Sequence, residues 1–68
     1  MSRVYMLKNR IARVTETKRG ELEVYTGITF RDGSEQAMPH FKGNNCRKTF
    51  KTNKTAMIAV HEFLYGGN

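Results

Sequence analysis

The chain has 68 residues, enough for one small domain with a thin core. Twelve Lys and Arg residues against six Asp and Glu residues give a formal net charge of +6, which favours polyanionic partners such as DNA, RNA, acidic protein patches or anionic lipid. The single cysteine excludes an intramolecular disulfide. There is no signal-peptide core and no apolar run of about 20 residues, so we expect a cytoplasmic protein with no membrane partner.

The first part of the chain predicts antiparallel strands over about 4–17, 21–31 and 34–41. Lys18, Arg19 and Gly20 suit a three-residue hairpin loop in which the glycine takes the left-handed position. That loop pairs Val14 with Val24 and Arg13 with Tyr25. The segment 4–7 either extends the first strand through a bulge near Asn9 or forms a separate edge strand.

The sequence Asp32-Gly33 predicts a second hairpin with a two-residue turn. This turn pairs Phe30 with Glu35 and Tyr25 with His40. Pro39 cannot donate to a strand ladder, so we expect the third strand to lie at an edge. A basic loop is expected over about 42–52, with an extended piece at 47–50 as an option.

A helix is predicted over about 53–65, capped by Thr52 or Asn53 and stopped by Gly66. Its apolar stripe consists of Ala56, Met57, Ala59, Val60, Phe63 and Leu64. We expect this stripe to pack on the strand face that carries Leu22, Val24, Ile28 and Phe30. The predicted fold class is α+β: a small antiparallel β-sheet of three to four strands packed against one C-terminal α-helix.

The residues 41–54 carry five basic side chains and no acidic one, a pattern typical of a phosphate-binding surface. If the helix covers one sheet face, the other is open, and side chains there can reach bases or phosphates of double-stranded DNA. We predict that four residues face the nucleic acid: Arg13, Tyr25, Gln36 and His40. We predict that six residues hold phosphates: Lys18, Arg19, Lys42, Arg47, Lys48 and Lys51. The alternative is a solvated face on which Arg13, Glu23 and Tyr25 only stabilise one another.

The sequence offers little for catalysis, and we predict no catalytic residue, no metal site and no cofactor. Two histidines and one cysteine do not make a metal-ligand pattern. Cys46 lies beside Arg47 and Lys48, but the sequence shows no base positioned to activate its thiol. We interpret Cys46 as a loop or minor core residue, and the protein as a binding module and not an enzyme.

The segment Lys48-Thr-Phe-Lys-Thr-Asn-Lys-Thr-Ala56 resembles the basic stretch that enters the helix in the arm-site-binding domains of phage-type tyrosine recombinases. Those domains, like the related Apetala-type plant domains, fold as three antiparallel strands packed on one helix. The resemblance covers nine residues. It implies that the open sheet face enters a DNA major groove, and it carries over no catalytic role. The family usually has an aromatic-Arg pattern in its first strand, whereas this chain has Arg10-Ile-Ala-Arg13.

Two functions therefore remain open. The first is a small basic nucleic-acid-binding protein, with DNA favoured over RNA. The second is a small phage-type inhibitor, anti-defence or anti-CRISPR-like, that binds an acidic or nucleic-acid-binding surface of a host protein complex. Ile58 and Tyr65 lie off the apolar stripe of the predicted helix and are candidates for a partner surface. The expected state is a monomer or a weak homodimer.

Overall fold

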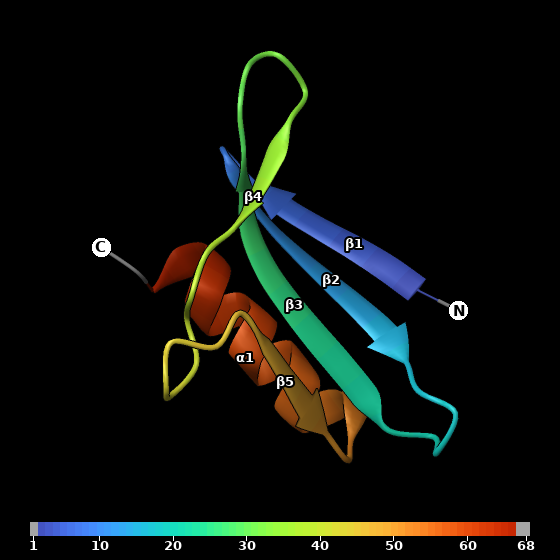
Figure 1. Cartoon of the computed structure of the whole chain (residues 1–68). Coiled ribbons are helices and arrows are strands. Elements are labelled where there is room, and N and C mark those ends of the chain that lie inside the picture. The colour runs from blue at the N-terminus through green and yellow to red at the C-terminus, as the bar shows by residue number, and fades with distance from the viewer. Residues whose placement is uncertain (1, 67–68) are drawn as a thin grey trace.

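The computed structural model describes residues 2–66 and shows an antiparallel sheet covered on one face by a C-terminal helix. The strands are β1 (Ser2–Leu7), β2 (Arg10–Glu16), β3 (Leu22–Thr29), β4 (Glu35–Ala37) and β5 (Arg47–Phe50), and the helix is α1 (Asn53–Tyr65). The sheet order is β1-β2-β3-β4, and β5 also pairs with β3. Figure 1 shows α1 behind the sheet, with β4 and β5 following one another along the same edge of β3. The predicted fold class is confirmed.

The hairpin of β2 and β3 has the predicted register. Val14 pairs with Val24 and Arg13 with Tyr25, and Gly20 takes a left-handed φ of 81° in the loop. The predicted single strand over 4–17 is wrong, because the chain reverses at Lys8 and Asn9 and splits it into β1 and β2. The alternative of a separate edge strand is therefore the correct one. Lys8 has a φ of 57°, a left-handed turn conformation that is uncommon for lysine, so the residue type does not predict it.

The second hairpin differs from its prediction by one residue. The Phe30 N–H donates to the Ser34 carbonyl, and the Gly33 N–H donates to the Phe30 carbonyl, so the loop has three residues and not two. Asp32 stabilises this loop by accepting bonds from the backbone and hydroxyl of Ser34, which also lower its pKa. The extra residue shifts the β4 register by one position. Every β4 side chain therefore lies on the opposite face from the one predicted.

The core lies between α1 and the inner face of β2 and β3. Its fully buried members include Ala12, Val14, Val24 and Phe63. The predicted helix stripe is confirmed, with Met57 the only member that is partly exposed. Thr52 caps the helix by accepting a bond from the Thr55 N–H. Phe30, predicted to join this core, is 47% exposed, because it lies beyond the end of β3.

Within residues 2–66, Thr26 is the one buried polar residue, and it joins the two strands that share the outer edge of β3. Its hydroxyl donates to the Met38 carbonyl at 2.7 Å, and its N–H donates to the Cys46 carbonyl at 2.8 Å. The Met38 N–H donates back to the Thr26 carbonyl at 3.1 Å. These bonds fix both ends of the crossover between β4 and β5.

We expect Thr26→Val to destabilise the protein by about 1–3 kcal/mol, because it removes the hydroxyl donor and leaves a polar carbonyl poorly satisfied. Urea unfolding would measure the change. Thr26→Ser is the matched control, since it keeps the donor and loses only a methyl group. An equal loss in both variants would show that packing, and not the hydrogen bond, is what Thr26 supplies.

Candidate nucleic-acid interface

The open face of the sheet, opposite α1, carries a row of cross-strand partners in which Tyr25 lies between two arginines. Tyr25 pairs with Arg13 of β2 on one side and with Arg47 of β5 on the other. The guanidinium carbons lie 5.5 Å and 5.0 Å from the centre of its ring, within the range of cation–π attraction. Burial raises the pKa of Tyr25. The two cation–π contacts hold Arg13, Tyr25 and Arg47 together in the absence of a ligand.

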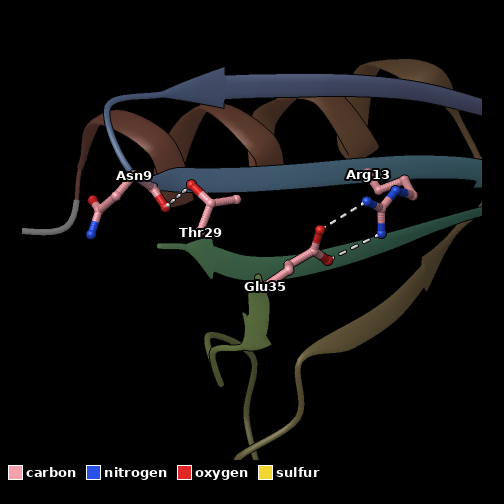
Figure 2. A network of polar contacts seen from close by, with 4 residues as sticks. All are labelled: Asn9, Arg13, Thr29 and Glu35. Carbon is pink, nitrogen blue, oxygen red and sulfur yellow. Dashed lines mark hydrogen bonds and ion pairs between the residues drawn. The ribbon is translucent and has the colours of Figure 1, made fainter. Parts of the chain in front are cut away.

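Each of these arginines also pairs with a carboxylate. Arg13 makes two bonds to Glu35, at 3.1 Å and 3.3 Å, and Figure 2 shows the two side chains pointing at each other from β2 and β4. Arg47 lies 3.5 Å from Glu23. The bond from Arg13 lowers the pKa of Glu35, and the same contact raises the pKa of Arg13. The four charges cancel, so the centre of the open face is electrically balanced.

Tyr25 also lies over Gly27, the next residue on this face. A Cβ atom at Gly27 would come 2.8 Å from the Tyr25 hydroxyl oxygen and 2.9 Å from the Gln36 carbonyl oxygen. Both distances are below normal contact, and the second involves backbone that cannot move aside. The glycine is therefore required for the tyrosine to lie flat along the strand.

Gln36 and His40 are not on the open face, so the prediction that places them there is wrong. The changed β4 register pairs Gln36 with Ile28 on the helix side of the sheet. His40 also lies on that side, with its ring 5.1 Å from the rings of both Phe41 and Phe63. Met38, between them in the chain, packs against the core. Of the predicted groove-facing set, the open face keeps Arg13 and Tyr25.

β5 and the residues that flank it carry the basic side chains of this segment. We call this surface the basic edge and define it as Lys42 before the strand, Arg47 and Lys48 in it, Lys51 after it and Lys54 in the first turn of α1. All five side chains are exposed. Because side chains alternate along a strand, Arg47 points to the open face and Lys48 to the helix side, where its amine lies 5.4 Å from the Phe50 ring. Within residues 2–66, the only ion pair that involves this edge is Arg47 with Glu23.

The remaining two predicted phosphate-binding residues lie near one end of this edge. Lys18 and Arg19 form the exposed tip of the hairpin between β2 and β3. Phe50, the last residue of β5, pairs with Leu22 at the start of β3, so the tip and Lys51 occupy the same end of the sheet (Figure 1). The structure thus brings all six predicted phosphate-binding residues to one edge and one end of the molecule.

A shallow groove of about 480 Å³ runs between the basic edge and α1. The aromatic rings of His40, Phe41 and Phe50 line it, with Lys42 and Lys48 on the strand side. On the helix side it is lined by Thr55, Ile58, Ala59 and Glu62. Aromatic surface flanked by lysines suits a base or an apolar side chain next to an anionic group. The sequence signal for this groove was the interleaving of Phe41 and Phe50 with the basic residues.

Ile58 and Tyr65 lie on the outer side of α1, as predicted, and are 50% and 62% exposed. The Tyr65 ring stacks on His61 with the ring centres 4.5 Å apart.

In residues 2–66, no group of three or more His, Cys, Asp or Glu side chains is placed to hold a metal ion. No helix in this part of the chain has the length and apolar character needed to cross a membrane.

Comparison with protein-family models, with curated proteins and with solved structures finds no match to this chain. The resemblance to recombinase arm-site-binding domains therefore stays a prediction.

We expect the Arg13–Glu35 pair to stabilise the fold by about 0.2–1 kcal/mol at neutral pH, as is usual for an exposed pair. Because the native pKa of Glu35 is lowered, this contribution is complete above the unfolded-state value, about 4.3, and is lost as the pH falls through the native value. Glu35→Gln should therefore be less stable than the parent at about pH 7 and match it at about pH 2. Urea unfolding at both pH values tests this.

Glu23→Gln is the matched control, since Glu23 makes one longer contact with its arginine. We expect its effect at neutral pH to be smaller than that of Glu35→Gln. An equal or larger loss would show that the bidentate geometry of the Arg13 pair adds nothing.

Proposed function

We propose that this protein binds nucleic acid, with double-stranded DNA as the preferred form, and that the basic edge is the contact surface. The observation that carries this proposal is the exposure of five cations on β5 and the residues that flank it, of which, within residues 2–66, only Arg47 is in an ion pair. Lys18 and Arg19 extend the same positive surface to the adjacent end of the sheet. Cations in this arrangement can follow the regularly spaced phosphates of a nucleic-acid backbone.

The charge balance of the open face supports the edge as the point of contact. For Arg13 to reach a base, its two bonds to Glu35 would have to break. Lys42, Lys48 and Lys51 need no such exchange. The recombinase resemblance implies the other mode, in which the open face enters the groove. The two modes differ in which arginine and lysine substitutions weaken binding.

Binding to labelled duplex DNA, single-stranded DNA and RNA at about 50 and 200 mM salt tests the proposal, because each phosphate contact contributes about 0.9 to the salt slope on duplex DNA. We expect the affinity for duplex DNA to be highest and to fall steeply between the two salt concentrations. Absence of binding to all three polymers at low salt would overturn the proposal.

We expect the double substitution Lys42→Gln with Lys51→Gln to lower the affinity for duplex DNA. It should also reduce the salt slope by about 1.8, the value for two phosphate contacts. The matched control is Lys8→Gln with Arg31→Gln, which removes the same charge from the opposite end of the sheet. Equal losses in the two variants would show a diffuse effect of net charge. A loss with Arg13→Gln and none with Lys42→Gln/Lys51→Gln would favour the open-face mode.

A second candidate function is inhibition of a host protein complex, and the exposed apolar side chains on the outer side of α1 favour it. Both Ile58 and Tyr65 are exposed apolar side chains, and Tyr65 lies outside the groove that Ile58 shares with Lys42 and Lys48 of the basic edge. A shallow groove of about 560 Å³ beside Ile58 is also lined by Met57, His61 and Lys54. Binding to a partner that survives high salt and is lost in Ile58→Ser/Tyr65→Ser would support this function over DNA binding.

A further inference from the structure

The outer edge of β1 carries backbone hydrogen-bonding groups that no other strand in residues 2–66 uses. The pairing register of β1, β2 and β3 identifies these residues. At the two ends of β2, Thr17 donates to the Glu21 carbonyl, and the Asn9 carbonyl accepts from Thr29. Odd-numbered residues along β2 therefore bond to β3. Because antiparallel ladders alternate, the even-numbered ones bond to β1.

The β1 partners of those even-numbered residues are Arg3, Tyr5 and Leu7, whose backbone groups point into the sheet. The N–H and C=O groups of Ser2, Val4 and Met6 consequently point away from it. These three positions form a free hydrogen-bonding edge along most of the length of β1. An unprotected edge of this kind is a template for another strand.

The free edge is complementary to itself. If two copies of β1 meet antiparallel with Val4 opposite Val4, Ser2 of each copy lies opposite Met6 of the other. All three free positions then pair, giving about six hydrogen bonds. On the helix side, the same register sets Arg3 of one copy opposite Tyr5 of the other. Arg3 already lies 5.9 Å from the Tyr5 ring of its own chain, so this residue pair is compatible with cation–π contact.

The side chains around this edge are apolar and exposed. Val4 and Met6 are 52% and 56% exposed on the open face. On the other face, a groove of about 440 Å³ separates β1 from α1, and its lining includes Tyr5, Met57, Leu64 and Tyr65. A second copy paired with β1 would lie across both surfaces. Arg3 is the one charged side chain of β1, so little charge on this strand opposes pairing with another strand.

The distribution of charge permits this pairing despite the net charge of +6 on each copy. The basic edge is on the far side of the sheet, three strand positions from β1. At about 4.8 Å for each position, that separation exceeds the Debye length of about 8 Å at physiological salt. In a β1–β1 dimer the two basic edges occupy the outer borders of the combined sheet.

We propose that this protein forms a two-fold symmetric homodimer through antiparallel pairing of β1 with β1, centred on Val4. We expect a contact made through one six-residue strand to bury less than the roughly 1,200–2,000 Å² of a standard interface, and the dimer therefore to dissociate on dilution. The proposal does not depend on nucleic-acid binding. It commits to a second copy of this chain as the occupant of the edge.

Sedimentation equilibrium over a wide range of protein concentration tests the proposal. We expect the parent to move from monomer toward dimer as the concentration rises. Val4→Pro should stay monomeric, because it removes an N–H that faces away from β2 and leaves the ladder within the chain intact. Val4→Lys should do the same by placing like charges opposite each other, and Val4→Thr, which keeps the branched side chain, should still dimerise. Circular dichroism establishes that each variant is folded.

A disulfide reports the register directly. In a Cys46→Ser background, Val4→Cys should form an interchain disulfide under mild oxidation, because opposed residues of an antiparallel pair lie about 5.5 Å apart between their Cα atoms. Thr49→Cys, an exposed position on the opposite edge of the sheet, is the matched control and should cross-link more slowly. A parent that stays monomeric at every concentration, or equal cross-linking at positions 4 and 49, would overturn the proposal.

Discussion

The structure depends on how one strand edge is shared between two short strands. β3 offers a single outer edge, and β4 takes its end while β5 takes its beginning. Thr26 lies at the junction and bonds to the chain on both sides, through Met38 and Cys46. A buried hydroxyl is tolerated there because its bond is made, and an apolar residue would leave the crossover without that anchor. The position of β5, and so of every cation it carries, follows from this junction.

The division of edge and face gives the molecule two surfaces of different electrical character. On the open face, Arg13 and Arg47 are neutralised by Glu35 and Glu23 and held against Tyr25. Along the basic edge, Lys42, Lys48 and Lys51 have no such partners in the described part of the chain. Because both surfaces carry basic residues, the positions of these residues in the sequence predict the same ligand for both. Pairing separates a structural set of charges from a set that remains free to act.

Much of the fold could be read from the sequence, because the signals were local and strong. The alternation of residues 21–30 and Gly20 fixed the hairpin of β2 and β3, and the apolar stripe with its Thr52 cap fixed the helix. The β4 register could not be read, since Asp32-Gly33 suits a two-residue turn as well as a three-residue loop. The difference rests on bonds from Ser34 to Asp32, and it reversed the faces of Gln36 and His40. The turn at Lys8 had no glycine to mark it.

Two arginines of the β1–β2 hairpin bond to the two ends of α1, and this fixes the direction of the helix relative to β1. Arg3 donates to the Asn53 side chain at the start of the helix, and Arg10 donates to the Phe63 carbonyl near its end. β1 and α1 therefore run the same way, and Ser2 and Gly66 lie at opposite ends of the molecule (Figure 1). Tension applied between those two residues would pull β1 along its own axis and load its ladder with β2 in shear. Shear loads all of the ladder bonds together, so the domain should resist stretching better than its small core suggests, with a rupture force governed by the unfolding rate.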